Sequence, residues 1–188
     1  MKNIATKDVL TILVLLIVFP GFLNAAGMNQ SKFADRLVVG DRKLKLTGEG
    51  MLRYWGFKIY TGAFYLEEGS SVDEALADRA KRIEIKYLRP IRAKEFGVAT
   101  DKNIAVNVDE ETLKRLRPKI EYHNSLYEDV LPGDRYSLTY IPGRGTELAL
   151  NGEPKGTIRG ADFAAAIFSI WLGPDPINLS FKNQILGL

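Results

Sequence analysis

Alternation of apolar and polar residues predicts strands in much of the chain. Lys43-Leu44-Lys45-Leu46 alternates with a period of two, and Gly48 and Gly50 just after it predict a bend or a bulge. Residues 57–66 carry aromatic and β-branched residues on both alternating faces. A strand that is apolar on both faces must be covered on both, so this one is expected at the centre of a sheet. Further strands are predicted at residues 36–39, 42–47, 82–87, 135–141, 146–150 and 155–159.

Helical spacing is concentrated in the middle of the chain and at its C-terminal end. Ser71 and Glu74 form a capping-box pattern that predicts a short helix to about Arg79. Longer helices are predicted at residues 91–107, after Asp109, at 161–172 and at about 178–186. Strands therefore precede and follow a helical block. This order favours an α+β fold with a mainly antiparallel sheet and helices packed on one face.

The N-terminus has the three parts of a secretory signal peptide. Lys2 and Lys7 precede the apolar segment 9–19, and small residues follow at Ala25 and Ala26. A retained anchor is the alternative, but the apolar segment is shorter than the ~20 residues that cross a membrane. We expect a signal peptide at residues 1–25 and one exported domain at 26–188, most simply periplasmic. No later segment is apolar enough to predict stable membrane insertion after cleavage.

Composition excludes several kinds of chemistry. The formal net charge is +3 and the basic residues are dispersed among acidic ones, so nucleic-acid binding is not expected. The chain has no cysteine and one histidine, which excludes a cysteine nucleophile and the usual Cys/His zinc site. We expect His123 to be a surface or helix-cap residue, and Asp109-Glu110-Glu111 to stabilise a helix N-terminus. No cofactor, metal site or catalytic residue is predicted.

Four segments together resemble one known family. These segments are Gly48-x-Gly50-x-x-Arg53, Lys58-Ile-Tyr-Thr-Gly-Ala-Phe-Tyr-Leu66, Tyr140-x-Pro-Gly-x-Gly-Thr146, and the closing stretch from Phe163. They resemble exported bacterial chalcone-isomerase-like proteins, over roughly residues 40–188. The resemblance implies the chalcone isomerase-like fold, a large curved antiparallel sheet with helices layered on one face. The α+β pattern of the chain predicts the same arrangement.

The resemblance also implies which residues stand at the positions that act in plant chalcone isomerases. Arg53 matches the arginine of those enzymes, and Asn103 matches their asparagine. Three other positions differ in chemistry: Tyr60 stands for a threonine, Phe96 for a tyrosine and Ile170 for a small polar residue. Phe96 has no hydroxyl to bind a ketone and Ile170 cannot orient a phenol. Chalcone cyclisation is therefore not expected.

Plant relatives of this fold bind fatty acids, which suggests an apolar or carboxylate-bearing small molecule as the ligand. In this hypothesis Arg53 holds the carboxylate, Tyr60 adds a hydroxyl contact, and apolar side chains line a slot between sheet and helices. The candidate ligand-binding residues are Arg53, Tyr60, Phe64, Phe96, Asn103, Ile170 and Trp171. The simpler alternatives are core packing for the aromatic residues and an ion pair with Glu49 or Glu67 for Arg53.

Two other functions stay open from the sequence. One is an accessory or interaction protein of the cell envelope, whose core is filled and whose surface binds partners. The other is an isomerase, or intramolecular lyase, that acts on an unknown substrate.

Overall fold

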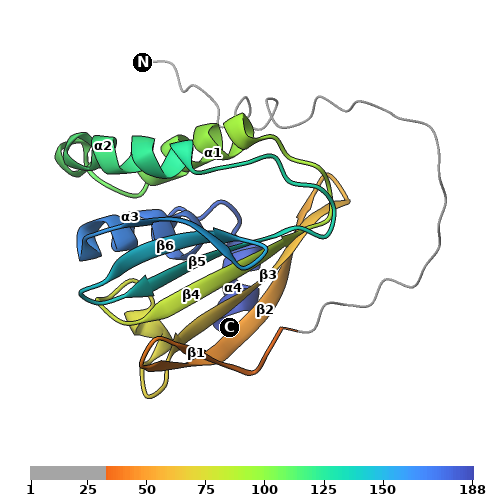
Figure 1. The fold of residues 1–188 in the computed structure, drawn as a ribbon. Helices are drawn as coiled ribbons and strands as arrows, with labels where there is room; N and C mark the ends of the chain where they lie inside the picture. Colours follow the sequence, from red (N-terminus) through yellow and green to blue (C-terminus); the bar gives the residue numbers. More distant parts are fainter. Residues whose placement is uncertain (1–32) are drawn as a thin grey trace, which may run out of the picture. The chain divides into compact units, whose positions relative to one another are not determined.

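Seven antiparallel strands pair in the order in which they occur in the chain, which confirms the predicted antiparallel sheet (Figure 1). The computed structural model describes residues 33–188, which form one unit. The strands are β1 (Arg36–Val39), β2 (Arg42–Tyr54), β3 (Phe57–Glu67), β4 (Lys81–Tyr87), β5 (Arg135–Ile141), β6 (Gly145–Leu150) and β7 (Glu153–Ile158). The predicted signal peptide lies outside the described residues. Within them, no helix has both the length and the apolar character that a membrane span requires.

Strand β3 is central and covered on both faces, as its sequence predicts. It pairs with β2 on one side and β4 on the other. Tyr60 and Phe64 point into the main core, whereas Tyr65 joins a second, smaller cluster with Phe33 and Leu44 on the opposite face. The short segment before β1 therefore contributes to covering the outer face of the sheet.

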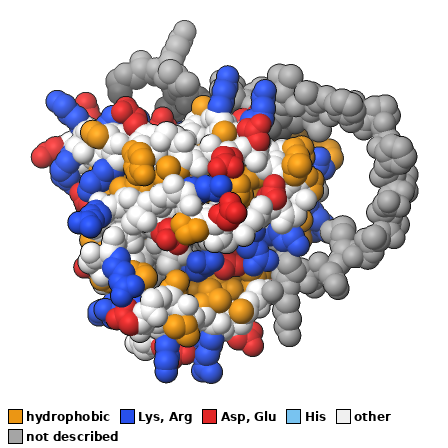
Figure 2. All heavy atoms as spheres, viewed as in Figure 1, with side chains coloured by type: hydrophobic (Ala, Val, Ile, Leu, Met, Phe, Trp, Pro, Cys, Tyr) orange, Lys and Arg blue, Asp and Glu red, His pale blue; other side chains and the backbone are white. Residues whose placement is uncertain are grey.

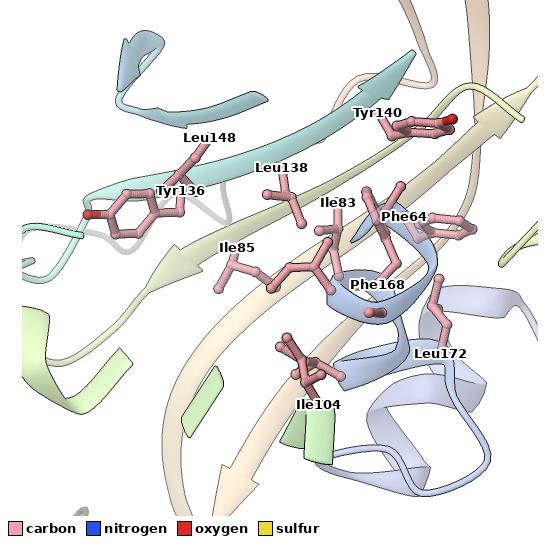
Figure 3. Close-up of a cluster of buried hydrophobic side chains, with 14 of the residues drawn as sticks. Phe64, Ile83, Ile85, Ile104, Tyr136, Leu138, Tyr140, Leu148, Phe168 and Leu172 are labelled. Carbon is pink, nitrogen blue, oxygen red and sulfur yellow. The ribbon is translucent and has the colours of Figure 1, made fainter. Parts of the chain in front are cut away.

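The helices lie in layers against one face of the sheet, which confirms the predicted fold. They are α1 (Ala93–Ala105), α2 (Glu110–Ser125), α3 (Ala161–Leu172) and α4 (Leu179–Leu186). Helix α3 lies between the sheet and the α1–α2 pair (Figure 1). Its Phe168 packs among core side chains of adjacent strands, including Phe64 and Ile83 (Figure 3). On the face seen in Figure 2, basic and acidic side chains are interspersed.

Helix α4 lies directly on a glycine surface formed by β2 and β3. A Cβ on Gly48 would lie 2.2 Å from the Gln184 carbonyl oxygen. A Cβ on Gly50 or Gly62 would lie 3.0 or 2.7 Å from the Phe181 ring. The missing side chains let α4 approach the strands, and the Thr47 hydroxyl then donates to the Ile185 carbonyl at 2.6 Å. The register of β2 shifts between Leu46 and Gly48, so the predicted irregularity is present at Gly48, whereas Gly50 pairs regularly with Gly62 and β2 continues to Tyr54.

The short helix predicted from Ser71 to Arg79 is reduced to one 3₁₀ turn, η2 (Val72–Glu74). The capping box is present, so the start of this element was predicted correctly. Beyond it the buried Lys81 Nζ binds this segment and donates to the Ala75 and Ala77 carbonyls at 2.8 and 2.6 Å. In an α-helix that ran to Arg79, the Arg79 N–H would donate to the Ala75 carbonyl; here it donates to the Ala77 carbonyl instead.

Adding one methyl group to the glycine surface tests this packing. We expect Gly48→Ala to lower the free energy of unfolding by about 2–3 kcal/mol, because the backbone of α4 must move away from β2. Gly97→Ala is the matched control, since a Cβ there meets nothing closer than 3.6 Å and the site is inside α1. This control should gain roughly 0.5–1 kcal/mol. Urea denaturation measures both, and equal stabilities would contradict the account.

Candidate functional site

Arg53 lies at the edge of the sheet, beside a surface hollow of about 340 Å³. Met51 and Arg53 on β2 line one side of it, and Asn178, Ser180 and Gln184 of the α4 region line the other. The Gln184 side chain joins the two sides, because its Oε1 accepts from the Met51 backbone N–H at 3.0 Å. The hollow thus exists because the glycine surface brings α4 against this strand.

The charge around this hollow is positive. Arg53 is exposed and forms no ion pair with any described residue, so the predicted alternative of a pair with Glu49 or Glu67 is not observed. Glu67 instead pairs with Arg42 at 2.8 Å. Within residues 33–188, no acidic residue lines the hollow. The N-terminus of α4, capped by Asn178, also lies there, and helix N-termini favour anions.

A layer of aromatic side chains packs between the sheet, the start of α1 and the segment that follows α2. The Tyr87 ring on β4 contacts Tyr60 and Phe96, with centroids 6.0 and 5.3 Å away. Phe96 in turn stacks on Tyr127 at 5.0 Å and meets Tyr136 edge-on at 5.5 Å. Edge-to-face and stacked contacts of this kind add to the burial of the rings. We call these five residues the aromatic layer.

Tyr60 connects the aromatic layer to α4. Its ring meets Phe181 at 5.1 Å, and its hydroxyl is buried without a hydrogen bond of good geometry. Burial raises the pKa of Tyr60 well above its usual value, and the nearby Trp171 side chain offsets part of that rise. The hydroxyl is therefore neutral and available as a donor. A buried polar group without a partner costs free energy, so such a group deserves a functional explanation.

The other candidate residues take several roles. Phe64 and Ile170 are buried in the main core, where the simpler alternative of core packing describes their contacts. Trp171 is partly buried at the edge of that core. Asn103 uses its side-chain amide within α1, donating to the Ala99 carbonyl at 2.7 Å. The structure thus brings Tyr60, Phe96 and Trp171 to the inner region and leaves Arg53 exposed near the end of β2.

His123 is buried, so its prediction as a surface or cap residue was wrong. Neither ring nitrogen has a hydrogen-bond partner, and the ring packs 4.9 Å from Tyr127 and 5.7 Å from Phe163. The signal was present in the sequence, because His123 continues a buried stripe of α2 at helical spacing through Leu116 and Ile120.

Lys81 is a second buried ionisable residue that sequence reasoning missed. It starts β4, and strand alternation places its side chain on the core face next to Phe168. Burial lowers the pKa of Lys81 to about 8, partly offset by Asp78. Its two carbonyl partners satisfy the amine, which gives it a structural role. Residues 33–188 contain no cluster of His, Asp and Glu that could hold a metal ion.

Comparison with known proteins adds two similarities. The model of one protein family, described as chalcone isomerase-like, matches residues 25–187. Among solved structures, the chain is similar to a fatty-acid binding protein from Arabidopsis thaliana, with a TM-score of 0.65 and 14% sequence identity. That similarity covers 82% of this chain and 90% of the plant protein. At this identity it shows a shared fold. No curated protein matches the chain.

The buried His123 predicts a loss of stability on acidification. Burial lowers the pKa of His123 to about 4, with Asn124 offsetting part of the shift, while the unfolded chain titrates near 6.5. The unfolded state therefore binds the proton first as the pH falls through 6.5, and stability falls from there towards pH 4. Between pH 7 and 5 this loss is roughly 2 kcal/mol.

Urea denaturation at pH 7 and pH 5 measures this effect in the wild type and in His123→Leu. The carboxylates titrate in both proteins, so the difference between them isolates the histidine. The variant should lose roughly 2 kcal/mol less than the wild type between these pH values. An identical pH dependence in the two proteins would show that His123 does not titrate differently on folding.

Proposed function

Because the chain belongs to the chalcone isomerase-like family, whose model matches residues 25–187, we propose that it binds a fatty acid or another apolar carboxylate without catalysis. The observation that carries this proposal is Arg53, an unpaired guanidinium in a hollow without acidic residues. A guanidinium offers a planar fork of donors that matches a carboxylate. The similar plant structure, titled a fatty-acid binding protein, supports the choice of ligand class.

In this proposal the apolar tail extends from the hollow towards the aromatic layer. Leu52 follows Met51 on β2 and lies opposite Tyr60, and Phe181 follows Ser180 on α4 and packs on the Tyr60 ring. We place the carboxylate at Arg53 and the tail along Leu52 and Phe181. The hollow is at the small end of the ~300–1,000 Å³ typical of ligand sites. A long tail therefore needs α4 to shift outwards, which would bring it towards the free hydroxyl of Tyr60.

The same geometry argues against isomerase chemistry. The residues at the positions used by plant chalcone isomerases are not gathered around Arg53. Phe96 and Ile170 carry no polar group, and the Asn103 amide is engaged within its own helix. The raised pKa of Tyr60 leaves its hydroxyl protonated near neutral pH, so it is a hydrogen-bond donor and not a base. Binding is the function that these residues support.

We also propose that the protein acts after export, most simply in the periplasm. Support comes from the basic start and apolar segment of residues 1–25, which are typical of a cleaved signal peptide. Comparing the N-terminal residue of the protein recovered from the cell envelope with that of the full chain tests this. An uncleaved N-terminus in the cytoplasmic fraction would contradict it.

Arg53→Ala tests ligand binding directly. We expect its affinity for palmitate, measured by calorimetric titration, to fall about 10- to 100-fold, because a charge-assisted hydrogen bond contributes about 1.5–3 kcal/mol. The affinity of Arg53→Lys should lie between those of the wild type and Arg53→Ala, because an ammonium keeps the positive charge but lacks the paired N–H donors of a guanidinium. Lys58→Ala is the matched control, because Lys58 is exposed directly opposite Arg53 and does not line the hollow. The proposal would be overturned if Arg53→Ala and Lys58→Ala lost affinity for palmitate equally, or if the wild type did not bind palmitate.

A further inference from the structure

The turn between β2 and β3 places a large aromatic side chain in a strained backbone conformation. Trp55 has φ +50°, and Gly56 beside it has φ +81°. Two central residues with positive φ are typical of a two-residue hairpin turn, where Asn, Asp or Gly is the usual first residue. Trp55 nevertheless occupies this position, and its side chain is 83% exposed. Burial of the Trp55 side chain does not offset this backbone strain, so the residue is better explained by a binding role than by stability of the fold.

Further aromatic residues surround Trp55 at this end of the sheet. Tyr54 meets the Trp55 ring edge-on at 6.1 Å, and Phe57 is 49% exposed. The hairpin lies at the far end of β2 from the β1–β2 turn (Figure 1). We call Tyr54, Trp55, Gly56 and Phe57 the aromatic tip. Its side chains are held out at the edge of the molecule.

Three basic residues that form no ion pair with a described residue lie beside the aromatic tip. Arg53 and Lys58 flank it on the two strands, and the Arg89 guanidinium lies 4.7 Å from the centre of the Phe57 ring. None of these three residues forms an ion pair with a described residue. Nearly all other arginines in residues 33–188 do, the exception being Arg159; the paired ones are Arg36, Arg42, Arg79, Arg82, Arg92, Arg115, Arg117, Arg135 and Arg144. Two of the three arginines without an ion pair in residues 33–188 therefore lie at the tip, while lysines without an ion pair occur elsewhere as well, for example Lys43 and Lys45 on β2.

We propose that the aromatic tip docks the protein on an anionic lipid surface. Trp and Tyr side chains favour the headgroup region, where one part of the ring is apolar and another is wet. Lys and Arg beside them are attracted to anionic headgroups. A protein partner fits less well, because a two-residue turn with three aromatic side chains offers less than the roughly 800 Å² that each side of a stable interface buries. Insertion into lipid needs no such area.

Docking in this way would set the hollow beside the lipid. Arg53 connects the hollow to the aromatic tip, because it lines the hollow and lies two residues before Trp55. An apolar carboxylate could then pass between membrane and protein without crossing water. The docking itself does not depend on a ligand in the hollow, so the two proposals fail separately.

Sedimentation with vesicles tests the docking. Residues 33–188 form a unit with its own core, so the chain without residues 1–25 is used and the predicted signal segment cannot bind lipid. We expect binding to vesicles of phosphatidylglycerol and phosphatidylethanolamine, and at least tenfold weaker binding to phosphatidylcholine. Charges are strongly screened at a salt concentration of about 0.5 M, so binding to the anionic vesicles should be weaker there.

Trp55→Asn is the decisive variant, because asparagine suits the positive φ and the fold is expected to keep its stability. It should bind anionic vesicles at least tenfold more weakly, and Lys58→Ala about fivefold more weakly. Val38→Ala is the control: Val38 is 73% exposed on β1, near the opposite end of β2, and its loss should change nothing.

Two results would overturn the proposal. One is the absence of wild-type binding to the anionic vesicles, which would leave a protein partner as the use of the tip. The other is Trp55→Asn binding as tightly as the wild type. Palmitate binding in vesicle-free buffer is expected to be the same in Trp55→Asn and in the wild type, which separates this test from that of the hollow.

Discussion

The close contact of helix α4 with the glycine surface of β2 and β3 is the constraint on which the candidate site depends. Gly48, Gly50 and Gly62 remove the side chains that would hold a helix away from the strands. As a result Phe181 reaches the Tyr60 ring, while Gln184 reaches the backbone of Met51. One contact therefore closes the inner end of the site and forms the hollow at its outer end. A larger residue on this surface would change both ends together.

Some buried polar groups in this protein have hydrogen-bond partners and others have none among the described residues. Lys81 donates to two carbonyls of the segment between β3 and β4, just after the turn that the capping box starts. Tyr60 and His123 have no such partners. Tyr60 belongs to the aromatic layer and His123 contacts its Tyr127, so an inserted ligand or a water molecule there would meet both. A structure with spare donors in an otherwise apolar layer is suited to binding more than to rigidity.

The sequence predicted the elements better than their ends, and the fold better than the site. Alternation and capping signals found β3, α3 and α4 because local patterns decide those segments. The end of β2 was missed because Gly48 and Gly50 look like a bend, whereas a helix far along the chain requires them within a strand. The position of Arg53 outside the aromatic layer, and the burial of His123, also depend on contacts between distant segments. Such contacts leave little trace in any one segment.

The central claim is that the hollow beside Arg53 receives an apolar carboxylate. Met51 lines this hollow, and its methyl group is a natural probe. We would label the methionine methyl groups with ¹³C and follow their NMR signals as palmitate is added below its aggregation concentration. The account predicts a saturable shift of the Met51 signal and the loss of that shift in Arg53→Ala. A Met51 signal that stays unchanged while palmitate binds would place the ligand elsewhere and contradict the account.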